Sequence, residues 1–296
     1  MSRFRFLLPP TEDVYTQLCK ERNVQPAKVV LDDGTKAYRL GPSSAEILIL
    51  NFHVPCNICG YVLPGNPEQF KFLWQLQSSM EKEGKNVAVL FLDYDLSPSV
   101  TYPRQLQQAS AVLSYLVHNL RKHPSNIMLC GDSAGGNLAA ALLSHLSHPH
   151  PQVPAVLMSS KLRGVGLISP QITFETKTAS FNVNSSADLI SAKTLSKWGA
   201  SFIGGLLNDN YTDAIQAPAH WWNNLKVGEI LVVVGNDELL LDSTQMFTSR
   251  LKEQHGNATQ AVIYGEGHNS CNIDAGMGFG NGVMGATVQK WIQARV

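Results

Sequence analysis

The sequence lacks an excess of charge of either sign, since Lys plus Arg and Asp plus Glu both number 23 and the formal net charge is zero. No broad electrostatic field therefore favours nucleic acid or an anionic membrane, and we expect a small-molecule substrate. The chain also lacks long apolar runs. Its strongest, at 87–92 and 230–234, fall far short of the roughly 18 to 20 residues of a membrane span. The first ten residues hold too short an apolar run for a secretory signal.

Cysteine is scarce, with five residues, an odd number without a signal peptide. This favours a reducing compartment over a disulfide framework, and we expect a cytoplasmic protein. Cys56 and Cys59 form a C-x-x-C pair that raises the alternatives of half a zinc site or a redox pair. No second pair matches it, because Cys130 and Cys271 are isolated. The pair is also not at the N-terminus of a predicted helix, which would lower the pKa of a redox thiol. We therefore expect no metal and no cofactor.

Short apolar runs alternate with longer segments of helical spacing. The runs lie at 47–52, 87–92, 127–130, 165–168, 230–234 and 261–264, and the helical segments at 68–82, 105–122, 135–146, 243–253 and 286–295. Apolar runs without strict alternation are typical of central parallel strands covered on both faces. The pattern predicts one α/β domain over residues 1–296, with a mostly parallel sheet flanked by helices.

One region breaks this alternation. Residues 174–218 are polar, rich in Ser, Asn and Thr, and locally helical around 187–202. Because open α/β sheets bind ligands at the carboxyl ends of their strands, we interpret this region as a small helical cap above the site. The other end of the chain is expected to contribute only a short N-terminal segment, residues 1–27.

The most informative motif is Gly-Asp-Ser-Ala-Gly-Gly at 131–136, which follows a predicted strand and opens a predicted helix. Gly131 and Gly135 remove the side chains that would clash where strand turns sharply into helix, so Ser133 is exposed on a strained turn. The helix N-terminus there also favours developing negative charge. The motif predicts a nucleophile elbow, the alternative being a glycine-rich turn with an incidental serine.

A serine hydroxyl needs a base, and that base needs an orienting acid. The histidine that follows a late predicted strand is His268, and the preceding predicted strand is followed by Asp237, Glu238 and Asp242. We predict His268 as the base and Asp237 as the acid, with Glu238 and Asp242 as rival acids. Asp242 is assigned instead to the N-cap of the helix predicted from residue 243, and a plain turn role is the alternative for Asp237. Three further histidines are expected to be solvated: His145, His148 and His150.

These motifs resemble the hormone-sensitive-lipase-like branch of the α/β hydrolases, whose elbow is typically Gly-Asp-Ser-Ala-Gly-Gly. Phe91-Leu-Asp-Tyr-Asp-Leu-Ser-Pro98, Tyr102-Pro103 and Leu167-Ile-Ser-Pro170 extend the similarity, which runs from residue 47 to the C-terminus. Trp221-Trp222 is similar to fungal members, a group that includes steryl-acetate and secondary-metabolite hydrolases. The resemblance implies an α/β-hydrolase fold and ester hydrolysis.

The sequence departs from this family in the loop after the strand 47–52. Family members carry His-Gly-Gly-Gly there, whose backbone N–H groups complete the oxyanion hole. Here the segment reads Phe52-His-Val-Pro-Cys-Asn-Ile-Cys-Gly-Tyr61. Alignment on Tyr61 leaves Gly60 and Cys59 in the last two motif positions and displaces His53. We predict the N–H groups of Ala134, Gly60 and Cys59 as oxyanion donors.

The second departure is the short N-terminal segment, which implies a smaller cap and a more open pocket. The residues that we predict to line this pocket are aromatic, with an ordinary core role as the alternative: Tyr61, Trp198, Phe202 and Trp221.

Together these features predict a serine carboxylic-ester hydrolase that acts through an acyl-enzyme on a small to medium apolar ester in secondary metabolism. One alternative is acyl transfer or condensation on a biosynthetic intermediate by the same residues. Another is a catalytically silent ligand-binding member of the fold, as the plant gibberellin receptors are. The expected partner is the small ester or acyl substrate, without nucleic acid or a membrane span. The expected partners include a second copy of the chain in a homodimer as an open alternative.

Overall fold

The computed structural model describes residues 8–53 and 60–296 of the chain. In this part, eight strands form one sheet with the order β1-β2-β4-β3-β5-β6-β7-β8. β1 and β2 pair antiparallel with their neighbours, and all pairs from β4 through β3 to β8 are parallel. The strands are β1 (Lys28–Val30), β2 (Lys36–Leu40), β3 (Ile47–Phe52), β4 (Val87–Asp93), β5 (Ile127–Asp132), β6 (Leu162–Ile168), β7 (Val227–Gly235) and β8 (Ala258–Ile263).

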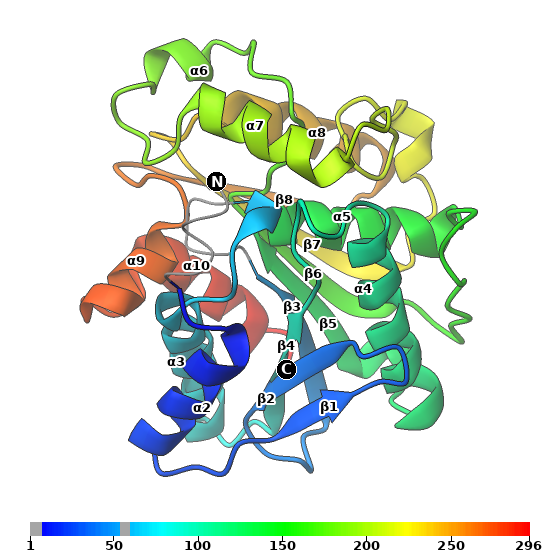
Figure 1. The fold of residues 1–296 in the computed structure, drawn as a ribbon, viewed down its shortest axis with the longest axis vertical. Coiled ribbons are helices and arrows are strands. Elements are labelled where there is room, and N and C mark those ends of the chain that lie inside the picture. The colour runs from blue at the N-terminus through cyan, green and yellow to red at the C-terminus, as the bar shows by residue number, and fades with distance from the viewer. Residues whose placement is uncertain (1–7, 54–59) are drawn as a thin grey trace.

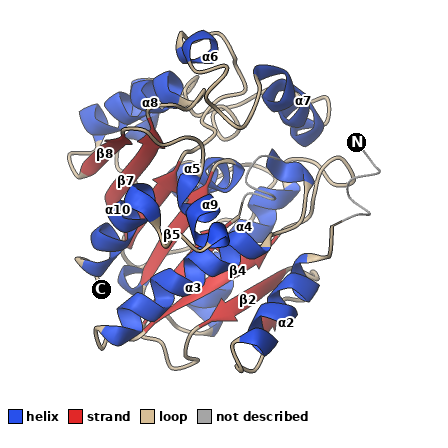
Figure 2. Cartoon of the chain, turned by 90° about the vertical axis from the view of Figure 1, so that its left-hand side faces the viewer, coloured by secondary structure: helices blue, strands red, loops and turns tan. Residues whose placement is uncertain are grey.

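Helices cover both faces of the sheet and one of its ends (Figures 1 and 2). The α-helices are α2 (Thr11–Glu21), α3 (Pro67–Lys82), α4 (Arg104–Ser114), α5 (Ala134–Ser147), α6 (Ser180–Val183), α7 (Ala192–Ile203), α8 (Leu241–Gln254), α9 (Ser270–Met277) and α10 (Gly282–Gln293). Their ends follow local chemistry. α3 begins with the Asn66 side chain accepting the Gln69 N–H and with Pro67 in its first turn. α7 ends at Gly204 in the left-handed conformation.

The two faces of the sheet bury two separate apolar cores. Along β3, Ile47 and Ile49 belong to the core under α2, α3, α9 and α10, whereas Leu48, Leu50 and Phe52 belong to the core under α4, α5 and α8. Successive side chains of a strand point to opposite faces, so a strand covered on both sides must be apolar throughout. This explains the unbroken apolar run at 47–52.

The predicted fold class is confirmed, and each predicted strand overlaps an observed one. The sequence pattern did not predict α2, the β1–β2 hairpin or α9. β1 alternates between exposed and half-buried residues at the sheet edge, so it carries no apolar run to detect. The helix predicted at 105–122 ends as an α-helix at Ser114 and continues as a single π-helical turn over Tyr115–Asn119.

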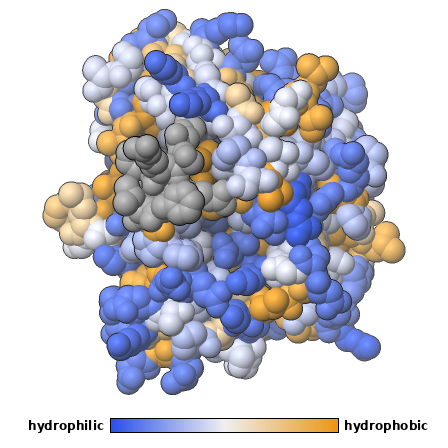
Figure 3. Space-filling view, viewed as in Figure 1, coloured by the Kyte–Doolittle hydropathy of each residue, from blue (hydrophilic) through white to orange (hydrophobic). Residues whose placement is uncertain are grey.

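The segment between β6 and β7, residues 169–226, carries α6 and α7. Both helices lie beyond the carboxyl ends of the parallel strands, beside α8 (Figure 1). We call it the β6–β7 segment, and it contains the region 174–218. On the face seen in Figure 3, polar residues predominate and hydrophobic side chains are scattered. Across the described ranges, 8–53 and 60–296, no helix is long and apolar enough to cross a membrane.

Candidate active site

Ser133 lies on a sharp turn between β5 and α5. Its backbone has φ 52° and ψ −112°, a conformation that costs energy for any residue with a Cβ. Three backbone hydrogen bonds fix the turn: the Ser133 N–H donates to Ile168 O at 2.9 Å, and its carbonyl accepts from Asn137 N and Gln171 N, both at 3.0 Å. The elbow predicted from the motif therefore has the expected geometry.

The two glycines of the elbow are required by close backbone approaches. A Cβ at Gly131 would overlap the carbonyl of Gly135, and a Cβ at Gly135 would overlap the carbonyl oxygen of Phe52 at the end of β3. Neither obstacle is a flexible side chain that could turn away. The elbow is thus packed directly against the start of the loop that follows β3.

Replacing Gly135 by Ala is therefore expected to lower the free energy of unfolding by about 3 kcal/mol or more, because backbone has to move to admit the methyl group. Urea denaturation measures this. Gly256→Ala is the matched control, since its Cβ would meet nothing within 4 Å, and a change within about 0.5 kcal/mol is expected there. An unchanged urea midpoint for Gly135→Ala would show that the elbow is not packed against β3.

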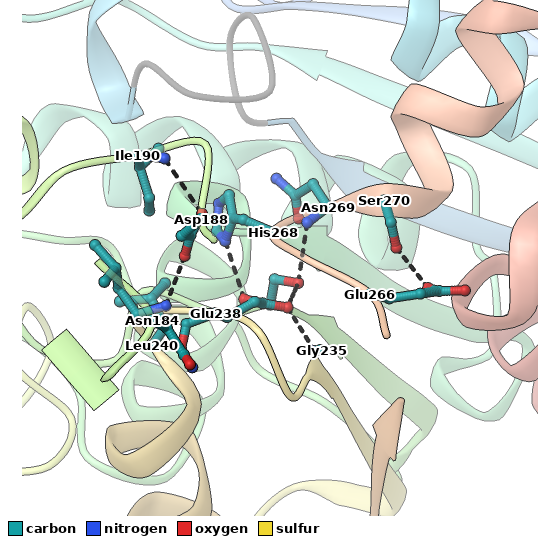
Figure 4. A network of polar contacts seen from close by, with 12 residues as sticks. Asn184, Asp188, Ile190, Gly235, Glu238, Leu240, Glu266, His268, Asn269 and Ser270 are labelled. Atoms are coloured by element: carbon teal, nitrogen blue, oxygen red, sulfur yellow. Dashed lines mark hydrogen bonds and ion pairs between the residues drawn. The ribbon is translucent and has the colours of Figure 1, made fainter. Parts of the chain in front are cut away.

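His268 lies on the loop after β8 and is completely buried. Its Nδ1 is 3.0 Å from Oε2 of Glu238, which follows β7 and is also fully buried (Figure 4). Its Nε2 is buried and has no hydrogen-bond partner among the described residues. β5, β6, β7 and β8 are neighbouring parallel strands in the sheet, so the loops after them lie together at the carboxyl ends of these strands. This places Ser133, Glu238 and His268 at the same end of the sheet.

The other carboxylate oxygen of Glu238 is held by two donors. Oε1 accepts the Gly235 N–H and the Ser169 hydroxyl, each at 2.6 Å. Ser169 follows β6 with φ 44°, and its Oγ in turn accepts the Asn269 N–H at 3.3 Å. Because every oxygen of Glu238 has a partner, its carboxylate is fixed in one orientation toward His268.

The structure does not place the predicted acid Asp237 beside His268, because the carboxylate there belongs to Glu238. Asp237 is half-buried, and its backbone N–H donates to Glu266 O at 3.2 Å. The chain turns back after Gly235, so Glu238 rather than Asp237 returns to the strand end. Asp242 is not an N-cap either: α8 begins at Leu241, and Asp242 lies in its first turn.

The charges around His268 favour its protonated form. Burial alone would lower the pKa of His268, but the hydrogen bond and charge of Glu238, with Asp188 and Asp132, raise that pKa above its ordinary value of 6.5. A histidine with a fixed carboxylate partner is suited to accept a hydroxyl proton and to stabilise the imidazolium that forms.

Asp132, the residue before Ser133, is a buried carboxyl that sequence reasoning did not single out. Its Oδ2 accepts from Asn272 Nδ2 at 2.9 Å, and its Oδ1 accepts from Gln69 Nε2. Burial raises the pKa of Asp132 to about 7, against the lowering effect of these two donors and of His268. The network joins α3, the elbow and α9 beneath the candidate site.

Asn272→Leu is expected to lower the free energy of unfolding by about 2 to 3 kcal/mol at pH 8.5, because it removes a donor from a buried carboxylate. The loss should be smaller at pH 5.5. The pKa of Asp132 is raised in the folded state, so the carboxyl is neutral there and charged only as pH rises through about 7. Urea titrations of wild type and variant at both pH values measure the difference. Equal losses at both would exclude Asp132 as the titrating group.

The predicted oxyanion donors are described only in part. Ala134 is the first residue of α5 and is fully buried, so its N–H has no partner within the helix. Gly60 begins a helical turn, Gly60–Val62. Cys59 and the other C-x-x-C cysteine, Cys56, lie outside the described residues.

Three of the four predicted pocket aromatics lie on two elements that contact each other, the turn Gly60–Val62 and α7. Tyr61 and Phe202 stack with ring centroids 3.8 Å apart, and the Tyr61 hydroxyl donates to Asn137 Oδ1 at 2.8 Å. Trp198 packs with Val62 in a separate small apolar cluster. Trp221 does not join them. Its Nε1 donates to Ser144 Oγ in the last turn of α5, about 16 Å along that helix from Ser133.

The histidines expected to be solvated are instead packed. His145 and His150 are buried, and the His150 N–H donates to His145 Nδ1 at 3.0 Å. His148 stacks on Trp221 with centroids 4.0 Å apart. The β6–β7 segment covers the end of α5, which the sequence pattern alone does not reveal.

Comparison with known proteins finds similarity to proteins named as ester hydrolases. Steryl acetyl hydrolase 1 of Saccharomyces cerevisiae is 24% identical over 231 residues, which cover 71% of this chain and 51% of that protein. An esterase of Acinetobacter venetianus is 29% identical over 168 residues, 56% of this chain and 51% of that protein. The chain thus spans about half the length of the curated relatives it matches.

Among solved structures, an esterase from the bacterial hormone-sensitive lipase family superposes with a TM-score of 0.77 at 22% identity, over 99% of this chain and 95% of that one. The predicted resemblance to this branch, with fungal members, is confirmed by these relatives. A family model described as the alpha/beta hydrolase fold matches residues 77–272, more than half of the sequence. The chain therefore belongs to the α/β-hydrolase-fold family.

Proposed function

We propose that the chain is a serine carboxylic-ester hydrolase that acts through an acyl-enzyme on a small to medium apolar ester. The observation that carries this proposal is the fixed Glu238–His268 pair. The pair lies at the carboxyl ends of the parallel strands, as does the strained turn at Ser133. A buried histidine with one nitrogen bonded to a carboxylate and the other free of partners in the described residues fits a general base.

In the first half-reaction, Ser133 Oγ attacks the ester carbonyl while His268 Nε2 takes its proton. Glu238 holds the imidazolium, and the N–H groups of Ala134 and Gly60 bind the tetrahedral oxyanion. Collapse breaks the ester C–O bond, and His268 returns the proton to the leaving alcohol. In the second half-reaction, His268 deprotonates water, which attacks the acyl-serine carbonyl. Collapse breaks the bond between the acyl carbon and Ser133 Oγ, His268 returns the proton to Ser133 Oγ, and the carboxylic acid leaves. The region 174–218 is proposed to act as the cap of this site.

The names of the relatives point to the substrate class. A yeast relative is named a steryl acetyl hydrolase and a bacterial one an esterase. Both names describe hydrolysis of carboxylic esters, and the first describes a short acyl group on an apolar alcohol. We therefore propose short-acyl esters of apolar alcohols as substrates. We also propose a cytoplasmic location, because the cysteine count is odd. A homodimer is a further alternative, and light scattering would distinguish it from a monomer.

The test is hydrolysis of p-nitrophenyl esters from acetate to octanoate, combined with a fluorophosphonate probe whose adduct is mapped by mass spectrometry. Hydrolysis with the adduct on Ser133 supports the proposal, and the acyl-length profile reports the size of the pocket. An adduct on Ser133 without hydrolysis would favour acyl transfer or condensation. If the protein shows no hydrolysis and no adduct, the silent ligand-binding alternative is favoured.

A further inference from the structure

The β6–β7 segment is bonded directly to the loop that carries Glu238. The Asn184 side chain donates to two carbonyls of that loop, Asn236 O at 2.9 Å and Glu238 O at 2.8 Å. Asp188 Oδ2 accepts the N–H of Leu239 at 2.6 Å. These contacts reach the backbone on both sides of the Glu238 Cα, and Figure 4 shows Asn184 and Asp188 beside it.

Further contacts hold the same two parts of the chain together. The Ser180 hydroxyl donates to Leu239 O at 2.6 Å, and the Ser180 N–H donates to Asp242 Oδ2 at 2.8 Å. The apolar cluster in this region contains four side chains of the β6–β7 segment, two of the Glu238 loop and one of the turn after Gly60: Phe181, Ile190, Leu195, Trp198, Leu239, Leu240 and Val62. The segment is thus packed and hydrogen-bonded to the loop, and does not rest only on the sheet.

Asp188 also adds charge at the site. Its Oδ1 accepts the N–H of Ile190 at 3.2 Å, which fixes the carboxylate within its own loop. Three carboxyl groups from three elements act on His268 and stabilise its imidazolium form: Glu238 after β7, Asp188 from the β6–β7 segment and Asp132 from the elbow. Of these, only Asp188 comes from the segment inserted above the sheet.

We propose that Asn184 and Asp188 are positioning residues that hold the Glu238 loop against His268, so that the docked β6–β7 segment sets the geometry and charge of the catalytic pair. This inference rests on the proposed function. It implies that residues 180–190 stay docked through the reaction, and that substrate enters elsewhere around the site.

The two residues make different predictions. Asp188→Asn removes a charge and presents an NH₂ group to one of two N–H donors. We expect kcat to fall about tenfold, because a less firmly held Glu238 loop positions His268 less accurately. The acidic limb of kcat/KM should also move to lower pH by a few tenths of a unit or more, because the imidazolium loses a stabilising charge. Asn184→Ala should lower kcat similarly and leave the acidic limb in place, because it removes no charge.

The measurement is kcat and kcat/KM for p-nitrophenyl acetate between pH 5 and 9. Glu175→Gln is the charge control, since Glu175 lies in the same region and pairs with Lys177, and Asn182→Ala is the neutral control at an exposed position. The inference is overturned if Asp188→Asn keeps the wild-type kcat and the wild-type position of the acidic limb. It is also overturned if both variants have a lowered Tm and an unchanged kcat. The proposed function would survive either result, provided that wild type hydrolyses the ester through Ser133. If Asp188→Asn does not fold, Asn184→Ala alone decides by its kcat.

Discussion

Replacing Glu238 by Gln is expected to lower kcat for ester hydrolysis by about 10⁴-fold. The reason lies in the two donors on Oε1, the Gly235 N–H and the Ser169 hydroxyl. They would hold the oxygen of the new amide in that position and turn its NH₂ group toward His268. Nδ1 would then have to accept a hydrogen bond, so the ring proton would lie on Nε2. In that tautomer His268 cannot take the proton of Ser133.

Asp237→Asn is the matched control, one residue away on the same loop. Because the Asp237 backbone N–H rather than its carboxylate makes the contact with Glu266, we expect kcat within about threefold of wild type, as for a substitution outside the site. Steady-state kinetics on a p-nitrophenyl ester measures both variants. A large loss in Asp237→Asn with a small one in Glu238→Gln would return the role to Asp237.

Ser133→Ala is expected to lower kcat by about 10⁵- to 10⁶-fold, the range seen when a serine nucleophile is removed. The burst of p-nitrophenol that reports the acyl-enzyme should vanish as well. The free energy of unfolding should stay within about 0.5 kcal/mol, because only one hydroxyl is removed. Rapid-mixing kinetics and urea denaturation measure these quantities.

Ser185→Ala controls for the loss of a hydroxyl as such. Its Oγ donates to Asn182 O in an exposed turn of the β6–β7 segment, and we expect wild-type kinetics. Residual hydrolysis by Ser133→Ala at more than a tenth of the wild-type rate would mean that another group performs the attack. It would contradict the proposed mechanism.

The parallel sheet and the sharp strand-to-helix turn at Ser133 could be predicted from the sequence, because each depends on local pattern: apolar runs and a glycine motif. The position of His268 after a late strand follows from the same pattern, and its role as base stays a prediction. The carboxylate that contacts His268 was not predicted. Asp237 and Glu238 are adjacent carboxylates on one loop, and only the turn after Gly235 decides which of them returns to the strand end. A Cβ at Gly235 would overlap the carbonyl of Glu266, so that glycine was the available signal of a close turn.

Other differences arise from packing between distant segments. The burial of His145 and His150 depends on contacts with the β6–β7 segment and with Pro154, which no local pattern predicts. The edge hairpin of β1 and β2 has no continuous apolar run because it lies at the sheet margin. The polar contacts of Asn184 and Asp188 join residues about fifty positions apart.

Glu266 connects the two loops that carry Glu238 and His268. Its carbonyl accepts the Asp237 N–H, and its carboxylate accepts from Val283 N, Met284 N and the Ser270 hydroxyl, which ties the His268 loop to the start of α10. The spacing of Glu238 and His268 is thus set where the loops meet. The chain between them reverses at 255–257, at the opposite end of β8. Gly256 and Asn257 are exposed in that distant turn. An insertion between them should leave the pair undisturbed, which makes this position the natural place to attach a tag, a fluorophore or a second domain.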